Sequence, residues 1–187
     1  MFRELLVREF APYGSLTLEQ IDALEAHYKL LTQWNSHLNL TRIESVEDAV
    51  RLHYCESLFV GTKLPEGSLR IIDVGSGAGF PGIPIAILRP EFSVTLVESH
   101  QRKSVFLREA SRNLPNVLVV TDRAENLETK YDWLVSRAVS PDDVLKLKLA
   151  NNLALLVGGD EVPGFERRES MPWGHGRFLT FHVERSC

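Results

Sequence analysis

The chain has 187 residues, of which 44% are hydrophobic and 25% charged, and these proportions predict one globular unit with a core of its own. No run approaches the roughly 18 apolar residues of a membrane span. The first ten residues mix charged with apolar side chains, unlike a signal peptide, so a cytoplasmic location without membrane contact is expected. Two cysteines, Cys55 and Cys187, exclude a disulfide framework and a zinc cluster, and no metal is expected. A net charge of −4 argues against binding nucleic acid through overall charge.

The first third of the sequence is predicted to be helical. Apolar residues recur three, four and seven positions apart over residues 18–38, and Thr17 and Gln20 form a capping box at the start of this segment. A shorter helix is expected over residues 2–10. Ser45 is placed to cap a third helix, which begins directly after it.

The rest of the chain alternates strand-like with helix-like segments. Short runs dense in Val, Ile and Leu are too continuous for strands with one exposed face, and they suit the buried interior of a parallel sheet. These runs occupy residues 69–74, 93–99, 116–122, 132–138 and 152–159; helices are expected over 101–113 and 140–150, and one further strand over 177–183. The alternation predicts a doubly wound α/β sheet over residues 67–187, with residues 1–66 as a helical extension packed on it. Ligands of such folds bind beyond the carboxyl ends of the strands.

A glycine-rich loop follows the first predicted strand. Gly75, Gly77 and Gly79 stand at alternate positions, where residues without a Cβ allow positive φ and close approach of a ligand to the backbone. This D-x-G-x-G-x-G pattern resembles the first motif of Rossmann-like methyltransferases that use S-adenosyl-L-methionine (SAM). A second register, Gly77, Gly79 and Gly82, satisfies G-x-G-x-x-G and leaves a nicotinamide or flavin nucleotide open. Pro81 favours the first register, because it suits a first helical turn but lacks an amide for a pyrophosphate.

Glu98 ends the second predicted strand. A carboxylate at this position can accept hydrogen bonds from both hydroxyls of an adenosine ribose. SAM and NAD both carry that ribose, so Glu98 does not distinguish between them. A surface carboxylate without a ligand is the simpler alternative.

Several segments together resemble the bacterial 16S rRNA (guanine-N7) methyltransferase G family, once called glucose-inhibited division protein B. The most distinctive is G-F-P-G-I-P within residues 71–90, and the others lie at residues 30–43, 52–58, 95–107, 121–127 and 133–139. The resemblance implies a class I SAM-methyltransferase Rossmann-like fold, a doubly wound sheet with an N-terminal helical extension. It further implies transfer of a methyl group from SAM to N7 of one guanine in small-subunit rRNA.

The family motifs also imply a set of cofactor-binding residues. Carried over position by position they are Gly75, Phe80, Ala124, Glu125 and Arg137, and Gly77 and Glu98 join them on the physical argument above. The Phe80 ring can lie against the cofactor or in the core. Ala124 is small enough to let the adenine approach, and Glu125 or a neighbouring amide can recognise its edge, with Asp122 as a rival.

Arg137 ends a buried strand, where a guanidinium needs a partner. It is expected to bind the methionine carboxylate of SAM or a phosphate of the RNA in a bidentate manner. The alternative is an internal ion pair with Asp73 or Glu56. Glu56 stands where the family pattern has Asp.

The implied chemistry needs no catalytic acid or base. Guanine N7 carries an exposed lone pair and no proton, so alignment with the sulfonium methyl group is enough. No catalytic residue is therefore predicted, and His53 is interpreted as structural.

The expected partner is 16S rRNA within the small ribosomal subunit or its precursor, bound by a monomer. A basic rim for this RNA is predicted from Arg102, Lys103, Arg108, Arg112, Arg123 and Arg137, although a solvated helix face explains most of these side chains equally well.

The tail lacks the family's lysine-glycine ending, and its last two strands are expected to be abbreviated. Two other classes stay open: a NAD-dependent oxidoreductase, and a SAM-binding assembly factor without catalysis.

Overall fold

The computed structural model describes residues 1–42, 45–137, 139–159 and 162–183. Its helical segments are α1 (Phe2–Phe10), α2 (Leu18–Leu38), α3 (Val46–Ala49), the π-helical η1 (Val50–Cys55), α4 (Glu56–Lys63), α5 (Gly82–Leu88), α6 (Gln101–Ala110), the 3-10 turn η2 (Ala124–Asn126) and α7 (Pro141–Leu147). Its strands are β1 (Arg70–Val74), β2 (Ser93–Val97), β3 (Val117–Val120), β4 (Tyr131–Arg137), β5 (Ala150–Gly158), β6 (Arg167–Ser170) and β7 (Arg177–Val183). Among these described helices, none combines the length and the apolar character that a membrane crossing requires. Cys55 is a buried free thiol, and Cys187 lies outside the described residues.

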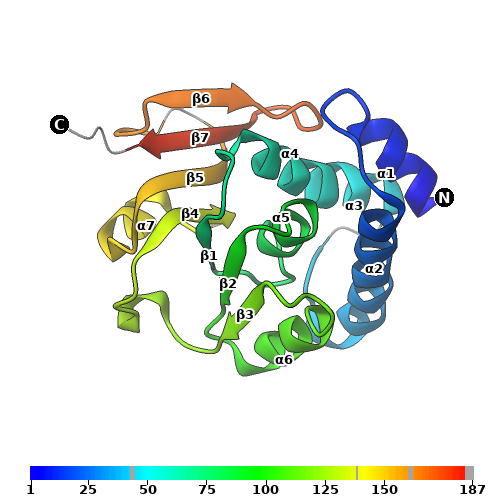
Figure 1. Ribbon diagram of the computed structural model, residues 1–187, viewed down its shortest axis with the longest axis horizontal. Helices are drawn as coiled ribbons and strands as arrows, with labels where there is room; N and C mark the ends of the chain where they lie inside the picture. Colours follow the sequence, from blue (N-terminus) through cyan, green and yellow to red (C-terminus); the bar gives the residue numbers. More distant parts are fainter. Residues whose placement is uncertain (43–44, 138, 160–161, 184–187) are drawn as a thin grey trace.

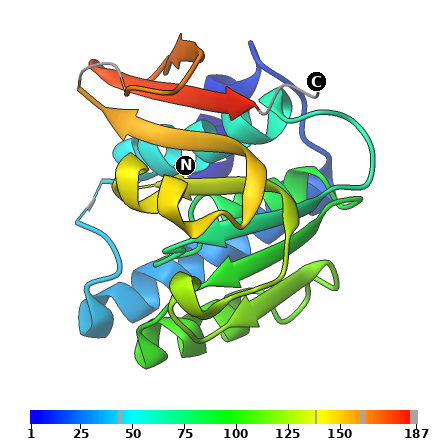
Figure 2. The ribbon, with the colours of Figure 1, turned by 90° about the vertical axis from the view of Figure 1, so that its left-hand side faces the viewer.

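The strands form one sheet in the order β3-β2-β1-β4-β5-β7-β6. Strands β1 to β5 run parallel, whereas β7 pairs antiparallel with both β5 and β6. Helices α2, α4, α5 and α6 cover one face of the sheet and α7 the other (Figures 1 and 2). The predicted doubly wound α/β sheet is confirmed.

Both faces of the sheet are covered, which explains why the strand sequences are apolar without alternation. Ile71 of β1 packs in the same cluster as Leu58 and Ile83, which come from the helices of one face. The next residue, Ile72, points to the opposite face and packs in the cluster that holds Val144 of α7. Consecutive strand residues therefore enter two separate cores.

Two features of the sheet differ from the sequence-based expectation. Strand β3 is an edge strand and not a buried one, and its Leu118 is 60% exposed. Strand β6 was not predicted, since its sequence Arg-Arg-Glu-Ser gives no apolar pattern. It is short, which agrees with an abbreviated tail, but both terminal strands are present.

The predicted helix starts are confirmed by their hydrogen bonds. The Thr17 hydroxyl accepts from the Gln20 N–H and the Gln20 side chain accepts from the Thr17 N–H, which completes the capping box. The Ser45 hydroxyl accepts from the Asp48 N–H at 3.0 Å. From there the helical path continues through η1 to the end of α4, further than the sequence indicated.

The N-terminal helices share a core with the sheet. Phe2, Leu24 and Leu58 belong to the same buried cluster as Ile83 and Phe106. Removing residues 1–66 would therefore expose one face of β1 and its neighbours. The division of the chain at residue 66 stays a prediction.

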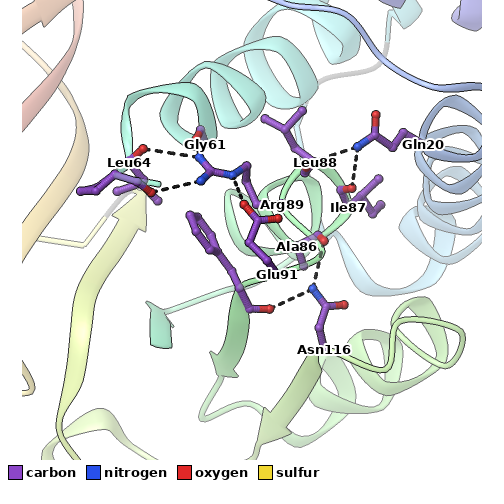
Figure 3. Close-up of polar contacts among 11 residues, drawn as sticks. Gln20, Gly61, Leu64, Ala86, Ile87, Leu88, Arg89, Glu91 and Asn116 are labelled. Atoms are coloured by element: carbon purple, nitrogen blue, oxygen red, sulfur yellow. Dashed lines mark hydrogen bonds and ion pairs between the residues drawn. The ribbon is translucent and has the colours of Figure 1, made fainter. Parts of the chain in front are cut away.

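Three polar side chains bind backbone carbonyls at the ends of α5 and α4 (Figure 3). Gln20 of α2 donates its amide hydrogens to the carbonyls of Ile87 and Leu88, at 3.1 and 3.2 Å. Asn116 donates to the Ala86 carbonyl at 3.0 Å. Arg89 binds the backbone at the end of α4, at the Gly61 carbonyl. The last carbonyls of a helix have no partner within it, so Gln20 and Asn116 satisfy those of α5 and Arg89 satisfies one of α4.

We expect Gln20→Ala to lower the free energy of unfolding by about 1–2 kcal/mol, because it removes a cap at α2 and two carbonyl partners at α5. Urea unfolding followed by circular dichroism measures the loss. Gln33→Ala is the matched control, since Gln33 lies exposed on the same helix and should change the stability by less than about 0.5 kcal/mol. Equal effects of the two substitutions would show that the capping contacts add nothing.

Candidate cofactor site

The glycine loop after β1 adopts the conformation that its sequence predicts. Gly75, Gly77 and Gly79 have φ angles of 72°, 55° and 87°, which side chains with a Cβ rarely tolerate. The N–H groups of Gly75 and Ser76 donate to the Val97 carbonyl of β2, at 3.0 and 3.1 Å. The loop therefore turns tightly over the carboxyl ends of two neighbouring strands.

The fourth glycine of this segment, Gly82, is needed because of its close neighbours and not because of its backbone angles. Gly82 has no positive φ, but a Cβ there would lie 2.3 Å from Leu96 and 2.6 Å from the Asp73 carboxylate. Its N–H donates to Asp73 Oδ2 at 2.9 Å. Pro81 precedes α5 at the N-cap position, one residue before the first helical turn in which it was expected. Helix α5 thus starts directly against β1, and Gly82 allows that approach.

A cavity of about 220 Å³ opens at the carboxyl ends of β1 and β2 and beside the loop after β3. Four of the predicted cofactor residues line it: Gly75, Glu98, Ala124 and Glu125. They come from three connections that are separate in sequence, and the parallel sheet brings them together. This is the edge at which ligands bind in doubly wound folds.

The Glu98 carboxylate is fixed by the backbone on both of its oxygens. Oε2 accepts from the Gly77 N–H at 3.0 Å and Oε1 from the His100 N–H at 2.8 Å. Gly77 does not line the cavity itself, but it holds the acid that does. Each carboxylate oxygen can accept about two hydrogen bonds, so both oxygens keep capacity for a ligand hydroxyl.

Sequence reasoning missed one wall of the cavity. Val139, Asp143 and Leu147, after β4 and along α7, line it opposite the glycine loop, and a Cβ on Gly75 would meet Val139 at 2.8 Å. Val139 ends one of the family-like segments but no role was assigned to it, and no motif marks Asp143 and Leu147, which the position of α7 against the sheet brings there. Asp122, the rival of Glu125, also lines the cavity, but its Oδ1 accepts from Asn126 and caps its own turn.

Phe80 and Arg137 lie outside the lining of this cavity. Phe80 is buried and stacks on His53 with ring centroids 4.7 Å apart. The Arg137 guanidinium lies 5.3 Å from the Phe80 ring centre and donates to the Leu52 carbonyl at 2.8 Å. Both residues therefore connect the glycine loop and β4 to the helices η1 and α4. Their role in cofactor binding stays a prediction.

Arg137 forms no ion pair with another described residue, so the predicted pairing with Asp73 or Glu56 is not seen. Glu56 is instead held by Arg177 of β7, at 2.5 and 2.6 Å. Burial lowers the pKa of Arg137 to about 10, which leaves it charged at neutral pH. Arg137 thus has no carboxylate in direct contact among the described residues, although Glu56 and Asp73 lie close enough to act on its charge.

Two buried histidines surround the loop from the other side. His27 Nε2 donates to the Ala78 carbonyl at 3.0 Å, and its Nδ1 accepts from the Tyr54 hydroxyl at 2.8 Å. The hydrogen bond from His27 to Ala78 connects helix α2 to the glycine loop, and no sequence pattern predicts this contact. His53 Nε2 bonds the Thr41 hydroxyl at 2.7 Å, in a buried setting that suits its interpretation as structural.

These buried groups predict that the protein loses stability in mild acid. Burial lowers the pKa of His27 to about 4 and that of His53 to about 2, whereas burial raises the pKa of Asp73 to about 7. Between pH 6.5 and 4 the unfolded chain binds two more protons at the histidines, and the folded chain binds one more at Asp73. The net difference of one proton costs about 1.4 kcal/mol per pH unit, or roughly 3 kcal/mol over this range.

Urea unfolding at several pH values measures this slope. His27→Gln should lower the slope by about 1.4 kcal/mol per pH unit between pH 4 and 6.5, whatever its effect on stability at neutral pH. His37→Gln is the control, because His37 is exposed on the same helix. A slope that His27→Gln leaves unchanged would mean that His27 takes up its proton in the folded protein.

The predicted basic rim is only partly free. Arg112 pairs with Glu109, and Arg108 donates to the Thr121 hydroxyl at 2.5 Å. Arg102 and Lys103 form no ion pair with a described residue, and Arg123 lines the cavity. Positive charge without a partner therefore gathers at the start of α6 and beside η2.

Comparison with known proteins agrees with this arrangement. A model of the rRNA small subunit methyltransferase G family matches residues 20–159. The chain belongs to this family. It is 45% identical over 129 residues to a family member named Ribosomal RNA small subunit methyltransferase G from Chromobacterium violaceum, covering 67% of this chain and 61% of that protein. A protein of the same name from Nitrosomonas europaea is 48% identical over 119 residues, covering 61% and 54%. The chain thus spans little more than half the length of these two family members.

Solved structures confirm the fold. A SAM-dependent methyltransferase from Aquifex aeolicus superposes with a TM-score of 0.57 at 14% identity, covering 72% of this chain and 91% of that one. Fibrillarin from Aeropyrum pernix, solved with S-adenosyl-L-methionine bound, superposes with a TM-score of 0.52 at 14% identity, covering 64% and 69%. The family member described here therefore has the class I Rossmann-like methyltransferase fold.

Proposed function

We propose that the protein is a SAM-dependent methyltransferase that modifies N7 of a guanine in 16S rRNA of the small ribosomal subunit. One observation carries the proposal: in a chain of this family, the cavity at the carboxyl edge of the sheet holds a fixed carboxylate, Glu98, beside a glycine turn. An acid at the end of the second strand is suited to the two ribose hydroxyls of an adenosine cofactor.

The residues of the cavity suit the adenosine part of SAM. Both Glu98 oxygens keep lone pairs for the ribose, Ala124 leaves room for the adenine, and Glu125 borders the same space. At about 220 Å³ the cavity is smaller than the roughly 300–1,000 Å³ of typical ligand sites, which favours the adenosine alone within it. Gly75 and Gly77 would face the methionine part along the loop, with Arg137 and Phe80 behind them. Bound SAM supplies the methyl group as a sulfonium.

The proposed acceptor atom fits the side chains that are present. Neither His nor Cys lines the cavity among the described residues; its titratable side chains are acids and Arg123. N7 of guanine has no proton to lose, so a base aligned with the methyl group of a cofactor bound in this cavity needs no general base. We therefore assign no catalytic residue.

The proposed substrate is the rRNA within the small subunit or its precursor, bound by a monomer in the cytoplasm. Arg102, Lys103 and Arg123 supply the free positive charge near the site. The overall charge of −4 favours a ribosomal particle, which offers shape and protein contacts, over naked RNA.

Methyl transfer from labelled SAM to small subunits that lack the modification tests the function, followed by mapping of the modified base. Label on guanine N7 is the expected result. Calorimetric titration with SAM and with NAD separates the cofactor classes, and NAD binding without SAM binding would contradict the proposal. SAM binding without methyl transfer would point to an assembly factor.

A further inference from the structure

A groove of about 770 Å³ lies between the end of α2 and the start of α6, outside the cofactor cavity. The two helices lie side by side in Figures 1 and 2. The groove is lined by Gln33, Trp34, His37, Leu38, Arg102 and Val105. Most of its surface is apolar although it opens to solvent, so it is neither core nor an ordinary polar surface.

The aromatic side chain of Trp34 forms part of this groove and packs against the core beneath it. Trp34 is half-buried and contacts the buried Phe106 edge-on, with ring centroids 5.8 Å apart. Val105, the residue before Phe106 in α6, is 52% exposed. A fixed, half-exposed indole beside an aliphatic side chain is a surface on which a flat base can stack.

The charge of the groove is positive in a chain that is acidic overall. Arg102 lines it and forms no ion pair or hydrogen bond with a described residue, and the neighbouring Lys103 is equally without a carboxylate partner. No acidic side chain lines the groove among the described residues. This combination of aromatic surface and free guanidinium complements a base with its attached phosphate.

The groove also lies close to the cofactor cavity. Ser99 lines the cavity and Arg102 lines the groove, so the two linings approach to within three positions of the chain, which span at most about 11 Å. Both open near the carboxyl end of β2, after which α6 begins. A strand of RNA that presents one base to a methyl donor bound in the cavity can therefore reach the groove with a neighbouring base.

We propose that the groove binds a nucleobase of single-stranded RNA that neighbours the methylated guanine, stacked on Trp34 with its phosphate on Arg102. The proposal rests on the proposed function, whose substrate it details. The groove would then contribute to the choice of guanine, because only a strand with an unpaired neighbour can enter it.

Binding to unmodified small subunits and to naked small-subunit rRNA, each at several salt concentrations, tests the groove without depending on methyl transfer. Trp34→Ala should weaken binding to both by about 5- to 100-fold, the loss of one stacked base, with partial recovery in Trp34→Phe. Arg102→Ala should also weaken binding and reduce the slope of log K against log salt by about 0.7, the loss of one single-strand phosphate contact. Trp34→Ala should leave that slope unchanged.

Matched controls separate the groove from general effects. Arg70→Ala removes an exposed arginine at the opposite end of the sheet and should change neither affinity nor slope. If Trp34→Ala unfolds, Val105→Glu takes its place, because Val105 is exposed and its replacement should not unfold the protein. Leu118→Glu is the control for Val105→Glu, since Leu118 is similarly exposed but lies on the edge strand β3.

Three outcomes would overturn the inference. Groove variants that bind and methylate like the unchanged protein would show that no base enters the groove, while leaving the proposed function intact. Loss of binding to intact subunits but not to naked rRNA would show that a ribosomal protein occupies it. If the unchanged protein binds neither particle nor rRNA, the proposed function fails and the inference falls with it.

Discussion

Replacing Glu98 by alanine is expected to raise the Kd for SAM by about 10- to 100-fold. The Glu98 carboxylate is 8% exposed and lines the cavity, so its hydrogen bonds to a ligand are shielded from water. A hydrogen bond to a charged group contributes roughly 1.5–3 kcal/mol, and each 1.4 kcal/mol is a factor of ten in Kd. Isothermal titration calorimetry measures the change directly.

The same acid holds Gly77 and His100, so loss of the ligand contact must be separated from disorder of the loop. Glu98→Gln keeps one carbonyl oxygen and the size of the side chain, and it should give an intermediate Kd. Glu128→Ala removes an exposed acid outside the cavity and should leave the Kd unchanged. An unchanged Kd in Glu98→Ala, with a normal unfolding curve, would remove Glu98 from the site.

The local parts of this site could be predicted because backbone chemistry determines them. Three alternate glycines after a strand require positive φ, and Gly75, Gly77 and Gly79 adopt it. Strands with a continuous apolar sequence must be covered on both faces, which leads to a parallel sheet and locates ligands at its carboxyl edge. Glu98 follows from that edge alone, whereas Ala124 was implied by the family motif.

Contacts between distant segments could not be predicted in the same way. Gly82 fits the glycine pattern, yet it is required by Leu96 and Asp73, which a Cβ would meet. Phe80 and Arg137 satisfy family motifs, but their neighbours come from η1, whose π-helical geometry no sequence pattern indicates. Such residues depend on how the N-terminal helices pack against the sheet, and that packing is a property of the whole core.

Glu56, which stands where the family pattern has Asp, makes another contact between distant segments. Glu56 of α4 is fully buried and accepts two hydrogen bonds from Arg177 of β7, which joins the C-terminal hairpin to the N-terminal helices. The Arg177 side chain is 37% exposed. The hydrogen bonds to Glu56 raise the pKa of Arg177, which keeps the guanidinium charged.

Because Glu56 is more deeply buried than Arg177, we expect their replacements to lower the free energy of unfolding by different amounts. Arg177→Met leaves a carboxylate with no access to water and should lower the free energy of unfolding by about 3–5 kcal/mol. Glu56→Gln leaves an arginine that reaches solvent and keeps one acceptor, so its cost should be about 1–2 kcal/mol. Urea unfolding at neutral pH measures both.

The double variant Glu56→Leu with Arg177→Met decides whether the pair itself stabilises the protein. Replacing a buried ion pair by apolar side chains of similar volume is often neutral, so the double variant should recover most of the loss seen in Arg177→Met. Recovery would show that the cost of Arg177→Met comes from the stranded Glu56 charge. If the two losses of stability add, this account is contradicted. Each side chain would then stabilise the protein through its own packing contacts, and the ion pair would contribute little.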